Sequence, residues 1–250
     1  MGKWIIRIIG ALLVLVIAGG LLLYFTDNRY SLSYRSYNAV RNASSMDLSF
    51  ESGMGMGENS LGITGDTLLV LDPNTSYTEI SMDLGPLGNR RIVDIYTEDD
   101  QVLHKYNLPF LSWQEGMPIL EEDSFNPAMF SELQMDVKLL DLLKFASILD
   151  KDEGEELLEY YTTDFFTPEE FKAILVNMLK LNEADVENWD IRTYEIRFSF
   201  HKEKKELEKL AVKFDYEVSE MVLDNELILI INALNSIEEI PLPEGIEDNP

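Results

Sequence analysis

The sequence contains no cysteine and only two histidines among its 250 residues. Disulfides, thiolate metal sites, thiol nucleophiles and lipidation at cysteine are therefore excluded. A zinc site would need several carboxylate ligands, and the H-E-x-x-H motif is absent. The two histidines, His104 and His201, lie in or beside expected strands and turns, so we interpret them as surface or packed side chains.

Basic residues are scarce, because 20 Lys and Arg stand against 46 Asp and Glu and give a net charge of −26. Nucleic acid is not expected as a partner, since phosphate binding requires a basic surface. With 46% hydrophobic residues the chain is nevertheless expected to fold, and its length suits one large domain or two small ones. The acidic surface is typical of a solvated domain, and it leaves a basic protein partner open.

Motifs for catalysis are also missing. Residues 57–62 have the wrong spacing for the G-x-S-x-G of serine hydrolases, and the glycines of 53–57 are not followed by the G-K-[ST] of a phosphate loop. The acidic segment 150–156 fails the EF-hand pattern, because Gly154 falls at loop position 5 and Tyr161 at position 12. We interpret this segment as a solvated turn between helices, with calcium binding left open. The chain is expected not to be an enzyme and to hold no cofactor or metal.

One long apolar run is present, from residue 8 to residue 25, without a charge. At about 1.5 Å per residue such a helix spans a bilayer, and Trp4 and Tyr30 at its two ends suit the interfacial aromatic belts. A cleaved secretory signal is the alternative, with a small-residue site at 18–20, but the apolar run continues beyond that site. We therefore expect an uncleaved transmembrane anchor.

The orientation of this anchor is nearly balanced by the basic residues on its two sides, and the basic start favours a cytoplasmic N-terminus. The bulk of the chain would then lie outside the cytoplasm, tethered to the cell membrane by a single pass. The expected organisation is a short cytoplasmic segment 1–7, the anchor 8–25, a juxtamembrane stalk 26–35, one α+β domain 36–243 and a frayed tail 244–250.

Residues 45–107 read as about five antiparallel strands that follow a short helix over 36–43. Apolar and polar residues alternate at 46–50 and 77–84, and 91–106 has the pattern of a hairpin. Parallel pairing would need crossover helices that the short links cannot hold.

A helical block follows. Asn126 and Pro127 are typical of a helix start, a short helix is expected over 155–161, and Thr167 to Glu170 forms a capping box. Strands return at 192–200, 210–218 and 226–232, with one apolar and one charged face. This pattern predicts an antiparallel sheet covered on one side by the helices of 127–181. One α+β domain is favoured over two domains divided near 114–123.

Several of these segments together resemble the LolA and LppX group of envelope proteins. They are the helix 37–43, the strand 46–50, Ile95-Tyr96 followed by His104-Lys105-Tyr106 and Trp113, and the ending Ile237-Glu238-Glu239-Ile240-Pro241. The resemblance implies a curved antiparallel sheet, an open half-barrel, whose concave apolar side is covered by a helical insertion and accepts acyl chains of a lipid or lipoprotein. Two features depart from the group: no lipobox cysteine is present, and the anchor would tether a protein that in LolA itself is free to shuttle.

The function expected from the sequence is binding of an apolar ligand, lipid or lipoprotein acyl chains, without catalysis. The alternative is a tethered sensory or protein-interaction domain with an acidic binding face and no ligand cavity. Candidate ligand contacts are the apolar faces of the expected helices, which would otherwise be ordinary core contacts with the sheet. These residues are Met129, Leu133, Val137, Leu140, Phe171, Ile174, Leu175 and Met178.

Overall fold

The computed structural model describes residues 28–56, 59–83, 88–99, 101–116, 139–154, 156–179, 183–219 and 221–246. Among these residues, no helix combines the length and hydrophobicity that a membrane crossing requires. The apolar run 8–25 lies outside them, as does the helix start at Asn126. The elements are α2 (Arg29–Arg41), β1 (Ser45–Met56), β2 (Asn59–Leu71), β3 (Asn74–Asp83), β4 (Asn89–Glu98), β5 (Gln101–Tyr106), β6 (Gln114–Glu115), α3 (Leu139–Ile148), β7 (Asp150–Glu153), β8 (Leu157–Thr162), α4 (Pro168–Leu179), α5 (Glu183–Val186), β9 (Asp190–His201), β10 (Leu207–Val218) and β11 (Met221–Leu234).

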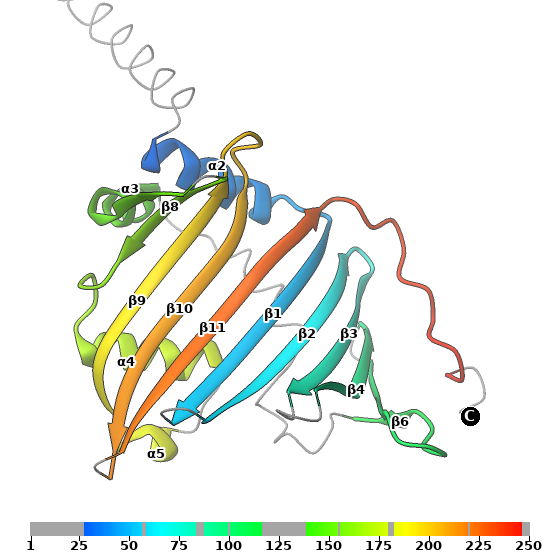
Figure 1. The fold of residues 1–250 in the computed structure, drawn as a ribbon. Helices are drawn as coiled ribbons and strands as arrows, with labels where there is room; N and C mark the ends of the chain where they lie inside the picture. Colours follow the sequence, from blue (N-terminus) through cyan, green and yellow to red (C-terminus); the bar gives the residue numbers. More distant parts are fainter. Residues whose placement is uncertain are drawn as a thin grey trace, which may run out of the picture.

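All the strands belong to one 11-stranded antiparallel sheet in the order β6-β5-β4-β3-β2-β1-β11-β10-β9-β8-β7. Strands β1 and β11 lie side by side in its middle, with Met46 opposite Leu234 and Gly55 opposite Asp224 (Figure 1). This pairing joins the two strand blocks of the sequence, so the expectation of a single antiparallel sheet is confirmed. The sheet is open, since β6 and β7 form its two edges.

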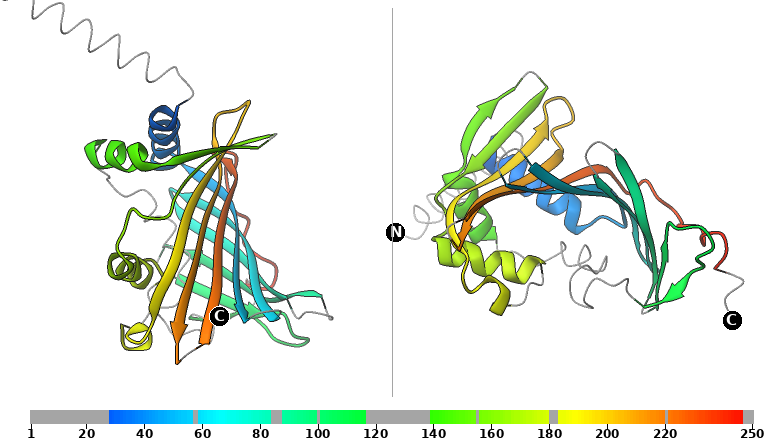
Figure 2. Two further views of the ribbon diagram at one scale, coloured as in Figure 1. Left: turned by 60° about the vertical axis from the view of Figure 1, so that its left-hand side comes forward. Right: turned by 60° about the horizontal axis from the view of Figure 1, so that its bottom comes forward.

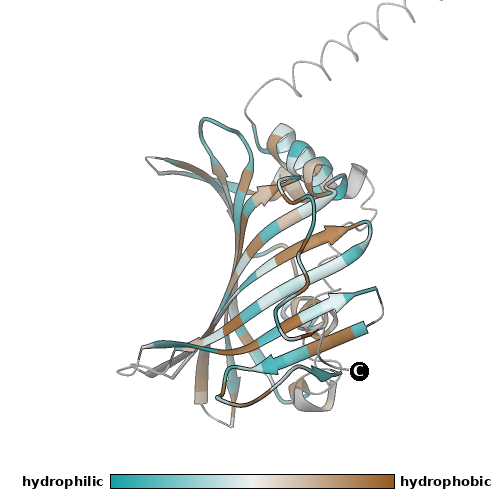
Figure 3. Ribbon diagram, turned by 90° about the vertical axis from the view of Figure 1, so that its right-hand side faces the viewer, coloured by the Kyte–Doolittle hydropathy of each residue, from teal (hydrophilic) through white to brown (hydrophobic). Residues whose placement is uncertain are grey.

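The sheet is curved, and helices α2 and α4 lie on its concave side (Figure 2). Side chains alternate between the two faces along each strand, and hydrophobic and hydrophilic residues alternate with them (Figure 3). In β1, for example, Met46 and Leu48 are buried in a cluster with Val40 of α2, whereas Asp47 points to the other, convex face and accepts a hydrogen bond from Asn232. The alternation of apolar and polar residues that predicted these strands therefore also places apolar side chains on the concave face and polar ones on the convex face.

Helix α4 begins at the capping box that the sequence predicts. The Thr167 hydroxyl accepts a hydrogen bond from the Glu170 backbone N–H at 3.2 Å, and the Glu170 carboxylate accepts one from the Thr167 backbone N–H at 2.9 Å. Helix α2 begins earlier than expected, because the Asn28 side chain caps it by accepting from the N–H groups of Tyr30 and Ser31. Part of the expected stalk is thus helical.

The expectation of a short helix over 155–161 is wrong, because residues 157–162 form strand β8. Its pairing with β9, with Leu158 opposite Phe200 and Tyr160 opposite Phe198, buries both of these β8 side chains. This long-range pairing outweighs the local helix propensity of the Glu and Leu residues. The turn expected at 150–156 is likewise replaced in part by the charged edge strand β7.

After β11 the chain runs in extended form along the convex side of β2 to β5. Ile240 is buried there in a cluster with Val70, Tyr96, Leu103 and Trp113. The Trp113 indole N–H donates to the Glu244 carbonyl at 3.1 Å, so the segment is fastened at least as far as residue 244. The extended C-terminal segment that the sequence predicts is therefore packed against the sheet.

Gly65 in β2 allows the Phe50 ring of β1 to lie across it on the concave face. A Cβ at residue 65 would overlap that ring and come within 2.8 Å of the Glu79 carbonyl oxygen, whereas a Cβ at Gly53 would meet nothing within 4 Å. We expect Gly65→Ala to lower the free energy of unfolding by about 1–3 kcal/mol through this overlap. Gly53→Ala, the matched control, is expected to change it by no more than about 0.5 kcal/mol. Urea denaturation measures both, and equal effects would contradict the packing of Phe50 on Gly65.

Candidate functional site

The concave face of the sheet carries few charges: on the described parts of β1 to β5 and β8 to β11, the register turns Arg90 of β4 inward, opposite Met82, but no Asp, Glu or Lys. Most inward positions are apolar, and the polar ones include Thr67, Thr78, Ser76, Thr97 and His104. Representative inward residues are Leu48, Phe50, Leu69, Ile80, Val93, Ile95, Tyr160, Ile196, Phe198, Leu210, Val212, Phe214, Leu227 and Leu229.

One end of this face is filled by α4. Phe171 and Leu175, both 1% exposed, pack there against Tyr194, Phe214 and neighbouring residues of β9 to β11. The Phe171 ring stacks on the Tyr194 ring with centroids 4.3 Å apart. The Tyr194 hydroxyl also donates to the Phe166 carbonyl at 2.8 Å, which fastens the segment before α4 to the sheet. This end is a closed core.

The other end of the concave face is covered by α2 and by the segment around α3. Leu32 of α2 is fully buried among Leu149, Leu158, Tyr160 and Phe200. The Arg29 guanidinium donates to the Leu149 carbonyl at 2.6 Å and so links the start of α2 to the end of α3. A second cluster continues along α2 towards β1 and β2.

Between these two covered ends lies a group of apolar side chains that are only partly buried, which we call the central strip. Along β9 it falls between Tyr194, under α4, and Phe200, under α2, and along β11 it falls between Leu223 and Leu234. Its members are Phe50, Ile196, Leu210, Leu227 and Leu229. The strip runs across the four central strands β9, β10, β11 and β1. Its side chains are all apolar, as the lining of a site for an acyl chain would be.

Polar side chains on the concave face include the His104 ring, which contacts the Gly116 carbonyl, and the hydroxyls of β2 to β4, whose buried members bond to each other. Thr67 and Thr78 share a hydrogen bond of 3.0 Å, and Ser76 and Thr97 share one of 2.6 Å. These groups satisfy one another and present no activated nucleophile. In the described ranges, no three His, Asp or Glu side chains are placed to hold a metal ion.

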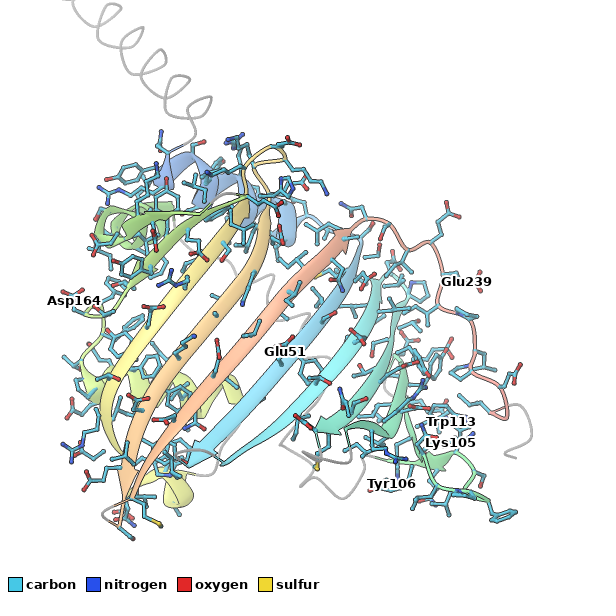
Figure 4. The ribbon with its side chains drawn as sticks, viewed as in Figure 1. Glu51, Lys105, Tyr106, Trp113, Asp164 and Glu239 are labelled. Carbon is cyan, nitrogen blue, oxygen red and sulfur yellow. The ribbon has the colours of Figure 1, made fainter. Side chains whose placement is uncertain are left out.

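Charges gather on the convex face, where many form ion pairs. Arg197 of β9 contacts Glu195 at 2.8 Å and Glu159 at 3.0 Å, and these carboxylates raise its pKa. Lys213 contacts Glu226 at 3.0 Å across β10 and β11. Figure 4 views this face, with Glu51 in the middle of the sheet. Because the two faces differ so completely in charge, apolar and polar partners would meet opposite sides of the same sheet.

Two shallow hollows also occur on the convex side. One, of about 290 Å³, lies beside Gly53 and Gly62 and is bordered by Glu51, Asp83 and Glu226. The other, of about 250 Å³, lies between the C-terminal segment and β2 to β4. Their acidic borders make them unsuited to an acyl chain.

The structure places the predicted contact residues in three situations. Phe171 and Leu175 face the sheet inside the core described above, whereas Ile174 is 37% exposed. Leu140 and Met178 lie in α3 and α4. Met129, Leu133 and Val137 lie outside the described residues. As ligand contacts, all eight remain a prediction.

All eight ligand contacts predicted from the sequence belong to expected helices, and none belongs to a strand. The central strip could have been found from the same period of two that predicted the strands. What the sequence does not show is which inward residues the helices leave partly exposed.

Neither a protein-family model nor a curated protein matches the sequence. Among solved structures, LprF from Mycobacterium bovis is similar at 9% identity, covering 86% of this chain and 96% of LprF, with a TM-score of 0.49. The lipoprotein LppX from Mycobacterium tuberculosis is similar at 8% identity over 85% of this chain and 98% of LppX, with a TM-score of 0.42. LppX is one of the two proteins that name the group that the sequence resembles. Both TM-scores are below 0.5, so the fold class rests on the strand order and register of the chain itself.

A buried tyrosine under α4 is expected to make this end of the domain less stable at alkaline pH. Burial raises the pKa of Tyr216, which stacks on Trp189 with ring centroids 4.0 Å apart, above its ordinary value of 10.0. A raised pKa in the folded state means that the stabilisation is fully present below about pH 10 and is lost as the pH rises further. We expect the Tm to fall as the pH rises above about 10, and Tyr216→Phe to reduce that fall. Thermal unfolding followed by circular dichroism measures this.

The control for this pH series is Tyr161→Phe, because the Tyr161 ring lies on the convex face beside Arg197. This variant should keep the alkaline loss of the parent chain. An unchanged fall in Tyr216→Phe would show that Tyr216 does not contribute to it.

Proposed function

We propose that this chain is a membrane-anchored extracytoplasmic protein that binds the acyl chains of a lipid or lipoprotein on the concave face of its sheet, without catalysis. The central strip carries the proposal. Its five side chains form an uncharged apolar track between α2 and α4 that the described residues leave partly exposed. Burial of apolar surface lowers the free energy by about 25 cal/mol per Å². An acyl chain that covers the exposed part of the strip would therefore be stabilised there.

The anchor of this proposal is the apolar run 8–25, which precedes α2 by only a few residues. Helix α2 both follows the anchor and covers one end of the concave face. The ligand track would therefore begin close to the membrane that holds the chain. The single α+β domain 36–243 follows as the part that binds, with α2 extending its start to residue 29.

The second candidate, a tethered interaction domain with an acidic face, draws on the convex side. Several acidic groups there are already paired with Arg192, Arg197 or Lys213 on neighbouring strands. Pairing of this kind lowers the charge offered to a basic partner. The concave strip is the more specific feature, and the experiment below separates the two candidates.

Two adjacent residues of β11 provide a matched pair for testing the concave face. Leu229 and Ile230 are both partly buried, but Leu229 belongs to the central strip and Ile230 points to the convex face, opposite Ser49. We expect Leu229→Gln to weaken acyl-chain binding by about tenfold or more, since a carboxamide in the strip must lose its water to admit a chain. Ile230→Gln should bind as the parent chain does.

The measurement is native mass spectrometry of the full chain, purified in mild detergent and offered phosphatidylethanolamine, with lipid extraction of the purified protein. Discrete added masses in the parent chain and in Ile230→Gln, but not in Leu229→Gln, are the expected result. Urea denaturation of all three checks that they fold. A parent chain whose mass never shifts would refute the lipid-binding proposal and favour the interaction domain.

A further inference from the structure

The loop between β5 and β6 exposes three large apolar side chains within four residues, which we call the apolar tip. Phe110 is 105% exposed, Leu108 is 63% exposed and Leu111 is 37% exposed, and Pro109 lies between the first two. A fully exposed phenylalanine between two exposed leucines is unfavourable in water, so a site of this kind indicates a surface that binds something apolar.

The tip is held in place by its base. The Asn107 backbone N–H donates to the Ile92 carbonyl at 2.9 Å before the tip, and Trp113 is buried and bonded to Glu244 after it. The Leu111 N–H donates to the Leu108 carbonyl at 3.3 Å across the turn. Phe110 itself has a φ of +73°, a region that bulky residues rarely adopt. The exposure of Phe110 is thus a feature of an ordered turn, kept despite an unfavourable backbone conformation.

The stretch of chain that carries the tip has few charges, although Glu115 follows it directly and the backbone of Glu244 is bonded to Trp113. No acidic residue occurs from Gln101 to Gln114, although 46 of the 250 residues are acidic, and Lys105 is the one formal charge in that stretch. Acidic groups would oppose insertion into a lipid surface, because a carboxylate must lose its hydration there. Tyr106 adds an aromatic ring with a polar hydroxyl, the type of side chain that is enriched at membrane interfaces.

The size of the tip favours lipid over protein as its partner. A stable protein interface buries about 800 Å² on each partner, over 20–30 residues. Three side chains in four residues fall far short of that area. A bilayer surface requires only a few inserted apolar side chains beside an uncharged rim, and it needs no matching pocket.

The position of the tip indicates which bilayer it meets. Tyr106, Lys105 and Trp113 lie at one corner of the sheet, and α2 lies near the opposite corner (Figure 4). The chain enters the described domain through α2, so the tip is far from the point at which the proposed anchor would hold it. We propose that the apolar tip inserts into a neutral, zwitterionic bilayer surface other than the membrane of the anchor. This inference rests on the proposed anchor for the choice of membrane, but not for the insertion itself.

The absence of cysteine allows a clean labelling test. Phe110→Cys carrying an NBD fluorophore is prepared in the full chain, which is held in phosphatidylcholine nanodiscs, and phosphatidylcholine vesicles are then added. We expect NBD emission at residue 110 to shift to the blue and rise only when vesicles are added. The matched control carries the label at Glu203→Cys, an exposed residue in the turn between β9 and β10, and should not respond to vesicles.

Leu108→Asp with Leu111→Asp, introduced beside the label, should weaken vesicle binding by about tenfold or more, because two inserted apolar side chains become charged. Both leucines are exposed, so the fold should persist, which the urea midpoint checks. No shift with vesicles would overturn the proposal. A full shift in the nanodisc alone would overturn the assignment to a second membrane.

The same double variant without the label separates this inference from the proposed function. It should retain bound lipid in native mass spectrometry as the parent chain does, because the central strip is unchanged. Lipid binding without vesicle insertion would leave the proposed function standing and refute the tip. Vesicle insertion without bound lipid would support the insertion of the tip and refute the proposed function.

Discussion

The pairing of β1 with β11 is the constraint on which the rest of the structure depends. It joins Met46 to Leu234, residues far apart in the sequence, and so turns two separate strand blocks into one continuous sheet. Without it, the contacts of α2 with β1 and β2 and those of α4 with β9 to β11 would belong to two separate sheets. With it, the two blocks share a single concave surface, and the register places Met46, Leu48 and Phe50 of β1 on the same face as Leu227, Leu229 and Leu234 of β11.

Separation of charge between the two faces follows from that register. Ion pairs such as Lys213 with Glu226 bridge neighbouring strands on the convex side, where water remains available, and they contribute little each. Their importance is that the strongly acidic composition is accommodated without placing a charge under the helices. The apolar side chains of the four central strands can then gather on the concave face.

Much of this fold could be predicted from the sequence, because one face of each long strand is polar and the alternation is therefore visible. The capping box of Thr167 and Glu170 located α4 for a similarly local reason. Strand β8 was missed because its local residues favour a helix, and only pairing with β9 decides otherwise. The central strip was missed because partial exposure depends on where α2 and α4 end. The tip was missed because Leu-Pro-Phe-Leu has the composition of a buried segment.

The central strip and the apolar tip meet different requirements of one task. A track such as the strip must be apolar yet incompletely buried, and its side chains are only partly buried between the closed packing of Phe171 at one end and Leu32 at the other. A contact such as the tip must instead protrude and carry no acid, which the turn at Phe110 provides between Tyr106 and Trp113, two residues that lie at one corner of the sheet (Figure 4). If the anchor holds one end and the tip touches a second lipid surface, the sheet spans the space between them. An acyl chain moving across that space would then have an uncharged path along the concave face.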